Sequence, residues 1–469
     1  MVLVINQQTF DDAVKENISE FGMEIQEAIN DAVKQFEAQG VDLSNIIKNN
    51  LLSPQVESTH DLKKALSVLR EHTQQKIVIS SSVLQEQLSV IKNECDKSIP
   101  HRVIAGKEGA YSILLQLITD KNGQEIAVVK NSLGALLSLM TKQPDLLEDT
   151  GIRTIIPLLG EEDDIEMQKL ILKWIKECCI MHEMNRQKIF QAGILSHLKT
   201  SLESDDSSLI RDVLGVLRAL VLDDDVRVEF GKAHDHARVI ASDTLSSITG
   251  LLTKTETDEP LVGDLLSTIS ALLVRTEFCK IVEEAGGLEA IKHAMVVFQD
   301  QDKIMRQYFK VLKALAGNDE VKIRIIQNGL APLLIASLDS NKNSNLTATV
   351  GLGCIAALTL RSTENSKAFF DSGAPEVIYD CMTIHPDDAS VQKNASWAIR
   401  NMVSRSRYQS QKFLDVGVEM ILQRNLKRFP NHEFDTKSAL RDLGCDVNLK
   451  EEWTGSGGLL TTQSKKNVS

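Results

Sequence analysis

The sequence is poor in aromatic residues and in proline, and this scarcity limits the fold classes that are compatible with it. Phe, Trp and Tyr together make up 4% of the 469 residues, and only 9 residues are Pro. Sheets of many short strands are enriched in aromatic and β-branched residues, whereas a chain with few helix breakers favours packed helices. Apolar residues make up 42%, which is enough for a continuous core. The composition therefore predicts an all-α protein.

Several further absences narrow the function. No apolar run reaches the length of about 18 residues that a membrane span needs, and MVLVINQQTFDD (1–12) lacks the regions of a signal peptide. Lys and Arg number 52 against 65 Asp and Glu, a formal charge of -13, whereas nucleic-acid binders need basic surface. We expect a monomeric protein of the cytoplasm, with the nucleus as a second location, that binds neither membranes nor nucleic acids.

The cysteines follow no disulfide or zinc pattern. They are odd in number and irregular in spacing, and no Cys-x-x-Cys occurs. We expect reduced, mostly buried thiols. The seven residues are Cys95, Cys178, Cys179, Cys279, Cys354, Cys381 and Cys445.

Seven glycines mark a repeated unit. Each follows an apolar residue by four positions and precedes an aliphatic residue by five, and the successive spacings are 42, 42, 93, 43, 44 and 44 residues. A Gly here permits a positive φ and a sharp bend between helices, and a longer amphipathic stretch such as 306–317 follows. Each unit is predicted to hold two short helices and a long third helix, stacked on its neighbours. The glycines are Gly109, Gly151, Gly193, Gly286, Gly329, Gly373 and Gly417.

Two segments resemble the armadillo repeat: NRQKIFQAGILSHL (185–198) and NASWAIRNMV (394–403). The resemblance implies an all-α, right-handed superhelical armadillo-repeat solenoid with an N-terminal helical extension. HEAT repeats are the alternative, but the Gly bend and the period near 42 favour armadillo. TFDDAVKENISEFGM (9–23) and ALRDLGCDV (439–447) resemble the ends of the armadillo repeat-containing protein 6 family, to which no activity is firmly attached.

The predicted organisation has four parts. Residues 1–40 form a helical pair, 41–98 a linker and helical segment, 99–430 about eight repeats, and 431–469 a C-terminal helix and disordered tail. No Gly stands at the bend expected near Thr244, so we predict a distorted repeat with an insert near 231–244.

The motifs that suggest chemistry are weak, so we expect a protein without catalytic site, cofactor or metal. GLGCIA (351–356) fits G-x-G-x-x-A, but no strand precedes it, and small residues in a packed helix explain it better. His182 and Glu183 begin like a zinc-protease helix, but Arg186 replaces the second ligand. His234 and His236 would chelate a metal only in an extended segment, and no third ligand is evident.

The same two histidines resemble, with Ala233, the small-His-x-His motif of a histidine N-methyltransferase. This resemblance implies a modification site at His234 and His236. The alternative is an exposed insert with two unmodified histidines.

The armadillo resemblance implies a concave groove of third helices that binds other proteins. Importin-type receptors bind basic peptides there through repeated Trp and Asn pairs, which should lie 20 and 16 residues before each Gly. Only Trp397 and Asn401 fit, so an importin-like transport receptor is the disfavoured alternative to a scaffold or adaptor. The predicted groove residues are Phe309, Lys313, Trp397 and Asn401, which this count gives, and the basic residue Arg400.

Basic residues are concentrated in the last repeat, whereas the loops EEDDIE (161–166) and LDDD (222–225) are acidic. This concentration predicts a docking patch for an acidic or phosphorylated peptide or helical segment; solvated helix ends are the alternative. The predicted patch is Arg405, Arg407 and Lys412, with Arg424, Lys427 and Arg428 nearby.

Overall fold

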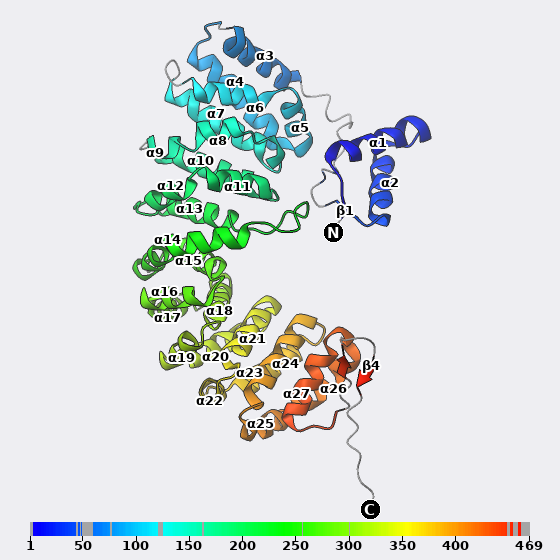
Figure 1. Cartoon of the computed structure of the whole chain (residues 1–469), viewed down its shortest axis with the longest axis vertical. Helices are drawn as coiled ribbons and strands as arrows, with labels where there is room; N and C mark the ends of the chain where they lie inside the picture. The colour runs from blue at the N-terminus through cyan, green and yellow to red at the C-terminus, as the bar shows by residue number, and fades with distance from the viewer. Residues whose placement is uncertain are drawn as a thin grey trace, which may run out of the picture. The chain divides into compact units, whose positions relative to one another are not determined.

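The computed structural model describes residues 3–43, 46, 48, 60–75, 77–120, 125–161, 164–255, 257–299, 301–447, 451–453 and 458–460. They are mostly helical, as Figure 1 shows. The chain divides into two compact units, Met1–Thr244 and Leu245–Ser469. Each unit is a stack of short helices, and the fold is an all-α armadillo-repeat solenoid.

The first unit begins with a small module that has its own core. Helices α1 (Gln7–Phe21) and α2 (Ile25–Ala38) pack together, and the rings of Phe10 and Phe36 lie 6.1 Å apart. Two short parallel strands, β1 (Leu3–Val4) and β2 (Val41–Asp42), join the module and were not predicted. Phe21 ends α1 and is 65% exposed, so it does not extend the buried face formed by Phe10 and Val14.

The helices of the first unit pack in repeating order. The long helices α4, α7, α10 and α13 contact one another in sequence, and shorter helices connect them. Helix α3 precedes α4 and packs against α4 and α6. The elements are α3 (His60–Gln75), α4 (Ser81–Lys97), α5 (Ile99–Lys107), α6 (Ala110–Thr119), α7 (Ile126–Met140), η2 (Pro144–Leu146), α8 (Asp149–Ile155), α9 (Leu158–Glu161), α10 (Ile165–Cys179), α11 (Glu183–Gln191), α12 (Ile194–Ser201) and α13 (Ser207–Ala219).

The second unit repeats this order more regularly. Its third helices α15, α18, α21, α24 and α27 contact one another in sequence. The elements are α15 (Glu259–Leu272), α16 (Thr276–Glu284), α17 (Gly287–Val297), α18 (Asp302–Leu315), α19 (Asp319–Gln327), α20 (Leu330–Ser340), α21 (Asn345–Thr359), α22 (Thr363–Asp371), α23 (Ala374–Ile384), α24 (Ala389–Val403), η3 (Arg407–Gln409), α25 (Ser410–Asp415), α26 (Val418–Arg428), η4 (Pro430–His432) and α27 (Glu433–Leu443).

The C-terminal boundary differs from the prediction. Helix α27 packs against α24 and α26 as the third helix of the last repeat, so the repeats continue past residue 430. Strands β3 (Glu451–Trp453) and β4 (Gly458–Leu460) then form an antiparallel pair, and β4 lies within the tail for which disorder is predicted. Most of the predicted disordered tail lies outside the described residues.

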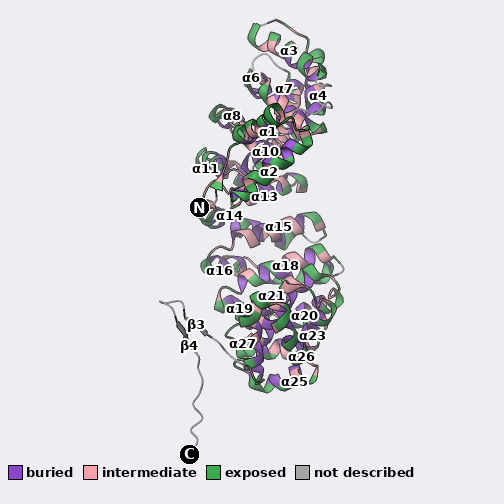
Figure 2. Cartoon of the chain, turned by 90° about the vertical axis from the view of Figure 1, so that its right-hand side faces the viewer, coloured by how far each residue is buried: buried purple, intermediate pink, exposed green. Residues whose placement is uncertain are grey.

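The core follows the helix faces that meet within each unit. Figure 2 shows the buried residues on these faces and the exposed residues on the outer faces. Six of the seven cysteines are buried and all are free, which agrees with the prediction of mostly buried thiols. Burial raises the pKa of Cys95 and Cys179 to about 12.

The bend glycines behave as predicted at six of seven positions. Gly109, for example, has φ 81°, and Gly417 has φ 96°. Gly151 is the exception, because it lies inside helix α8 rather than at a bend. A side chain on Gly151 would collide with the Tyr111 hydroxyl, which accepts a hydrogen bond from the Glu148 N–H at 3.2 Å. Close packing, not a positive φ, therefore requires this glycine.

The repeat without a bend glycine has no bend. The predicted insert near 231–244 is the first part of one continuous helix, α14 (Ala233–Lys254), which runs across the boundary between the units. Thr244 lies inside this helix and donates its hydroxyl to the Ile240 carbonyl at 2.8 Å. A threonine in this position continues the helix, whereas glycine would permit the turn.

Among the described residues, no single helix is long and apolar enough to cross a membrane. Helices α19 and α20 reach the required length and hydropathy only when they are combined, and the two helices meet at a bend of 79°.

Candidate functional site

The third helices of the second unit correct the predicted groove register. Phe309 is fully buried and packs against Tyr308, with ring centroids 5.4 Å apart, so it does not line a groove. The burial pattern of α18 instead places exposed Lys310 at the position that half-buried Trp397 occupies on α24. Lys310 lies 19 residues before Gly329, whereas Trp397 lies 20 residues before Gly417, so a fixed count of 20 back from each Gly selects Phe309 instead of Lys310.

We define the third-helix face as the exposed or half-exposed side chains that α18 and α24 present on either side of α21. Residues three or four apart on a helix share one face, which places Arg306, Lys310 and Lys313 of α18 together. The set is Arg306, Lys310 and Lys313 on α18, and Lys393, Asn394, Trp397, Arg400 and Asn401 on α24.

The cations of α18 are only partly balanced by acids. Arg306 lies 3.3 Å from Asp302, on its own helix. Neither Lys310 nor Lys313 forms an ion pair with any carboxylate in the described part of the chain. Two lysines therefore stand on this face without a carboxylate partner, although the chain as a whole is acidic.

Helix α21 lies between α18 and α24, and its Gly353 presents no side chain between them. A methyl group on Gly353 would lie 3.5 Å from Nζ of Lys313 and 3.3 Å from Nδ2 of Asn394. Nδ2 of Asn394 also donates to the Thr349 carbonyl at 2.8 Å, which holds the amide in place. The G-x-G-x-x-A stretch is thus part of a helix. Gly351 is needed for packing, because a methyl group there would lie 2.8 Å from Cδ1 of Leu338.

The predicted Trp and Asn pair is already engaged within the chain. Nζ of Lys393 lies 4.7 Å from the centre of the Trp397 ring, the position of a cation–π contact. Nδ2 of Asn401 donates to the Ala356 carbonyl at 2.8 Å, and Nε of Arg400 lies 3.8 Å from Oδ2 of Asp442. Lys310, Lys393 and Asn394 were missed by the sequence analysis, although the i, i+4 spacing of Lys393 and Trp397 could have indicated their contact.

The basic patch of the last repeat is spread over several elements. Arg405 precedes η3 and Arg407 is its first residue, and both are exposed. Nη1 of Arg405 approaches the Arg361 carbonyl at 3.5 Å. Lys412 lies on α25, and its ammonium pairs with Glu376 at 2.6 Å. One of the three patch charges is therefore balanced by an acid.

The two candidate histidines lie in the first turns of α14 and not in an exposed insert. His234 is exposed, whereas His236 is buried, stacks on Phe190 with centroids 4.1 Å apart, and places Nδ1 3.1 Å from the Leu220 carbonyl. Two positions apart on a helix point to different sides, so the pair cannot hold one metal ion. No group of three or more metal-binding side chains occurs among the described residues.

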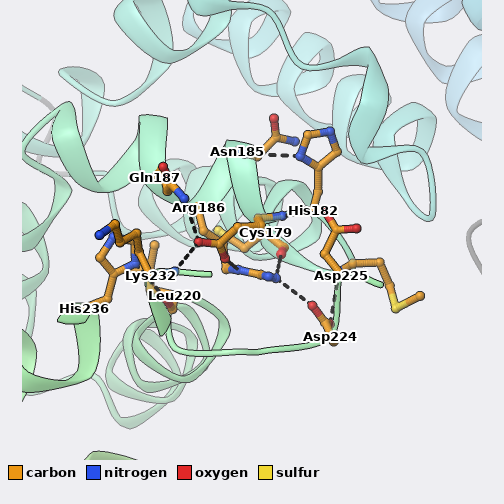
Figure 3. A network of polar contacts seen from close by, with 12 residues as sticks. Cys179, His182, Asn185, Arg186, Gln187, Leu220, Asp224, Asp225, Lys232 and His236 are labelled. Atoms are coloured by element: carbon orange, nitrogen blue, oxygen red, sulfur yellow. Dashed lines mark hydrogen bonds and ion pairs between the residues drawn. The ribbon is translucent and has the colours of Figure 1, made fainter. Parts of the chain in front are cut away.

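Near His236, a buried ionic network ties the segment after α13 to α11, as Figure 3 shows. Arg186 is 1% exposed and contacts Glu183 at 3.0 Å, Asp224 at 2.6 Å and the Cys179 carbonyl at 2.7 Å. Glu183 also accepts from the Lys232 N–H at 2.5 Å. His182 caps α11 by accepting from the Asn185 N–H at 3.2 Å, so its role is structural.

A second acid extends this network. Burial opposes the ionisation of Asp225, but hydrogen bonds from Arg227 and from the Glu183 N–H outweigh it and lower the pKa of Asp225 to about 2. Asp145 contacts His182 at 3.1 Å and Arg227 at 2.8 Å, and these hydrogen bonds lower its pKa to about 2. The network therefore stabilises the fold through ionised carboxylates.

Comparison with known proteins identifies the family. The ARMC6 family model matches residues 62–462, and the model of the armadillo repeat-containing protein 6 N-terminal domain matches residues 3–65. The chain belongs to the armadillo repeat-containing protein 6 family. The armadillo repeat-containing protein 6 homolog of Drosophila melanogaster is 44% identical over 460 residues, which cover 97% of this chain and 98% of the fly protein. The Homo sapiens member is 33% identical over 478 residues, covering 97% and 94%.

Solved structures support the fold of this family member. The crystal structure of an engineered protein aligns with a TM-score of 0.70 and 18% identity over 94% of this chain and 100% of that protein. A structure from work on a phosphorylation switch between cadherin and beta-catenin aligns with a TM-score of 0.58 and 14% identity, over 81% and 68%. At these identities the likeness concerns the fold alone.

Proposed function

We propose that this protein is a non-catalytic interaction scaffold or adaptor, and that its third-helix face binds a segment of a partner protein. The observation that carries the proposal is the pair Lys310 and Lys313, which lack carboxylate partners in the described chain and lie on the same face as half-exposed Trp397. Armadillo solenoids offer such a face on stacked third helices. The protein works as a monomer in the cytoplasm and also in the nucleus, without cofactor or metal.

The partner segment is acidic, or phosphorylated, under this proposal. The face carries several cations and few acids, and opposite charge steers encounter and fixes the register of a bound segment. The overall charge of -13 opposes nucleic acid as the ligand, since a nucleic-acid binder needs an extended basic surface to replace phosphate counterions.

An importin-like receptor for basic peptides remains the disfavoured alternative. In such a receptor the Trp ring receives a ligand cation and the Asn amide binds the peptide backbone. Here Lys393 already covers Trp397 and Asn401 already donates to Ala356. A basic peptide would also meet Lys310 and Lys313, so like charges oppose its binding.

Affinity purification with mass spectrometry tests the proposal through two variants of equal charge change. Lys310→Glu with Lys313→Glu reverses the third-helix face, and Arg405→Glu with Arg407→Glu reverses the basic patch. We expect the first variant to lose partners that wild type captures and the second to retain them. The opposite result would move the binding site to the patch, and full retention by both variants would contradict the proposal. Binding of a basic peptide by wild type would instead favour the importin-like alternative.

A further inference from the structure

The third-helix face contains one point on which two hydrogen-bond donors converge. The ammonium of Lys313 comes from α18 and the amide of Asn394 from α24, and both lie within 3.5 Å of the place where a side chain of Gly353 would begin. Gly353 is buried and has no side chain that would separate these two donors. The two nitrogen atoms are therefore close enough for one acceptor atom to bridge them.

Both donors have hydrogen-bonding capacity left. A side-chain amide nitrogen carries two N–H donors, and Asn394 uses one of them on the Thr349 carbonyl. That contact fixes the amide without using the second N–H. Lys313 carries three donors and a full charge, and it forms no ion pair with the described carboxylates.

The same pairing of lysine and glycine occurs in the first unit, but with different chemistry. A methyl group on Gly215 would lie 3.7 Å from Cδ of Lys176, and one on Gly134 would lie 3.9 Å from Cδ of Lys92. At both places the glycine meets an apolar lysine stem. Only at Gly353, among these three described positions, do a lysine ammonium and an amide meet the glycine.

We propose that Lys313, Asn394 and Gly353 form a seat for the carboxylate of an Asp or Glu side chain from an extended partner segment. This seat rests on the proposed function, because it lies on the same third-helix face. Hydrogen bonds between charged donors and carboxylates are about twice as strong as neutral ones, so the ligand atom is an anionic oxygen. Lys310, three residues before Lys313 on α18, offers a second cation to the next acidic side chain on the same side of the segment.

The full-length chain tests the seat with a defined probe. The probe is a fluorescein-labelled peptide of six Glu-Thr pairs, whose carboxylates lie on one side when it is extended, and the matched peptide carries Gln for Glu. Fluorescence anisotropy measures binding at low salt. We expect Lys313→Gln and Gly353→Ala each to weaken binding of the Glu peptide by about tenfold. Gly353→Ala keeps every charge and improves helix propensity, so it reports on the seat and not on folding.

Gly215→Ala is the matched control, because it adds the same methyl group beside a lysine stem in the first unit; it should bind the probe as wild type does. Asn394→Ala should weaken binding severalfold in the same assay. If Lys310→Gln weakens binding while Gly353→Ala and Asn394→Ala bind like wild type, the proposed carboxylate seat is contradicted. Binding then depends on the cations of the third-helix face alone. If wild type binds the Glu and Gln peptides equally, the seat is also wrong. The proposed function is then judged by partner capture alone.

Discussion

The lysines on the third helices of the two units differ in their ion pairs. In the first unit, Lys169 pairs with Glu166 at 2.9 Å, Lys173 approaches Asp212 at 3.7 Å, and Lys130 pairs with Asp164. In the second unit, Lys310 and Lys313 have no such partner among the described carboxylates. Lys130, Lys169 and Lys173 of the first unit are thus paired within the fold, whereas Lys176 on α10, like Lys310 and Lys313, has no ion pair with a described carboxylate.

The two units also differ in a buried cation that precedes one bend of each unit by seven residues. Arg186 in the first unit contacts two carboxylates and one carbonyl. Lys322 in the second unit occupies the same place, but its ammonium contacts the Leu360 carbonyl at 2.9 Å and the exposed Asp319 at 2.6 Å. A count of charges therefore does not locate a binding face; the partners of each charge do.

The largest effect is expected from removing the buried cation of the first unit. Arg186→Met leaves Glu183 and Asp224 without their main counter-charge and should destabilise the first unit by about 3–5 kcal/mol. Lys322→Met in the second unit should cost about 1–2 kcal/mol, because it breaks hydrogen bonds but leaves only an exposed acid. Urea unfolding followed by hydrogen exchange, resolved by unit, measures both. Equal losses from the two variants would remove the contrast between the buried cations.

A smaller effect is expected at Asp225, and it depends on pH. The folded state lowers the pKa of Asp225 from 3.8 to about 2, so ionised Asp225 contributes stability above pH 4 that is lost as the pH falls toward 2. Asp225→Asn should therefore cost about 2 kcal/mol at pH 7, and the difference from wild type should shrink between pH 4 and 2. Stability curves of both proteins from pH 7 to 2 test this, and a constant difference would show that the lost hydrogen bonds act without the charge.

The contrast between the faces can be sharpened by freeing lysines in the first unit. Asp164→Asn with Asp212→Asn removes the acids beside Lys130 and Lys173 at nearly constant volume. Surface pairs contribute little to stability, so the fold should be retained while affinity for the Glu-Thr peptide rises about threefold. Anisotropy at two salt concentrations measures this gain, and adding Lys310→Gln with Lys313→Gln should return it toward the wild-type value. If Asp164→Asn with Asp212→Asn does not raise the affinity for the peptide, unpaired lysines are not sufficient for binding.

The sequence predicted the repeats well because their signal is local. An apolar residue four before each Gly and an aliphatic residue five after it determine where two helices meet, and six of these glycines adopt the left-handed conformation. Gly151 looks identical in sequence, but its role depends on Tyr111, which lies 40 residues earlier and cannot be inferred from spacing.

The third-helix face was predicted only in part, for a related reason. Lys313 and Trp397 were named, but a one-residue difference in spacing to the following Gly selected buried Phe309 in place of exposed Lys310. Asn394 had no signal in sequence, because its importance comes from contacts with two neighbouring helices. Local periodicity predicts which residues are buried, whereas side chains from different repeats meet only through packing.

The smallest effect concerns the two histidines in the first turn of α14. One ring is packed within the fold, whereas the other is exposed to solvent. A methyltransferase needs access to the ring, and His234 is exposed while His236 is 7% exposed and stacked on Phe190. If the resemblance to the methyltransferase motif holds, peptide mass spectrometry of the native protein should show an increment of about 14 Da on residues 232–238, with fragment ions that place it on His234. His234→Gln should remove the increment and change the free energy of unfolding by less than about 0.5 kcal/mol, because the side chain is exposed. An increment on His236 instead would require α14 to open at its first turn before modification, since the folded helix holds that ring against Phe190 and the Leu220 carbonyl.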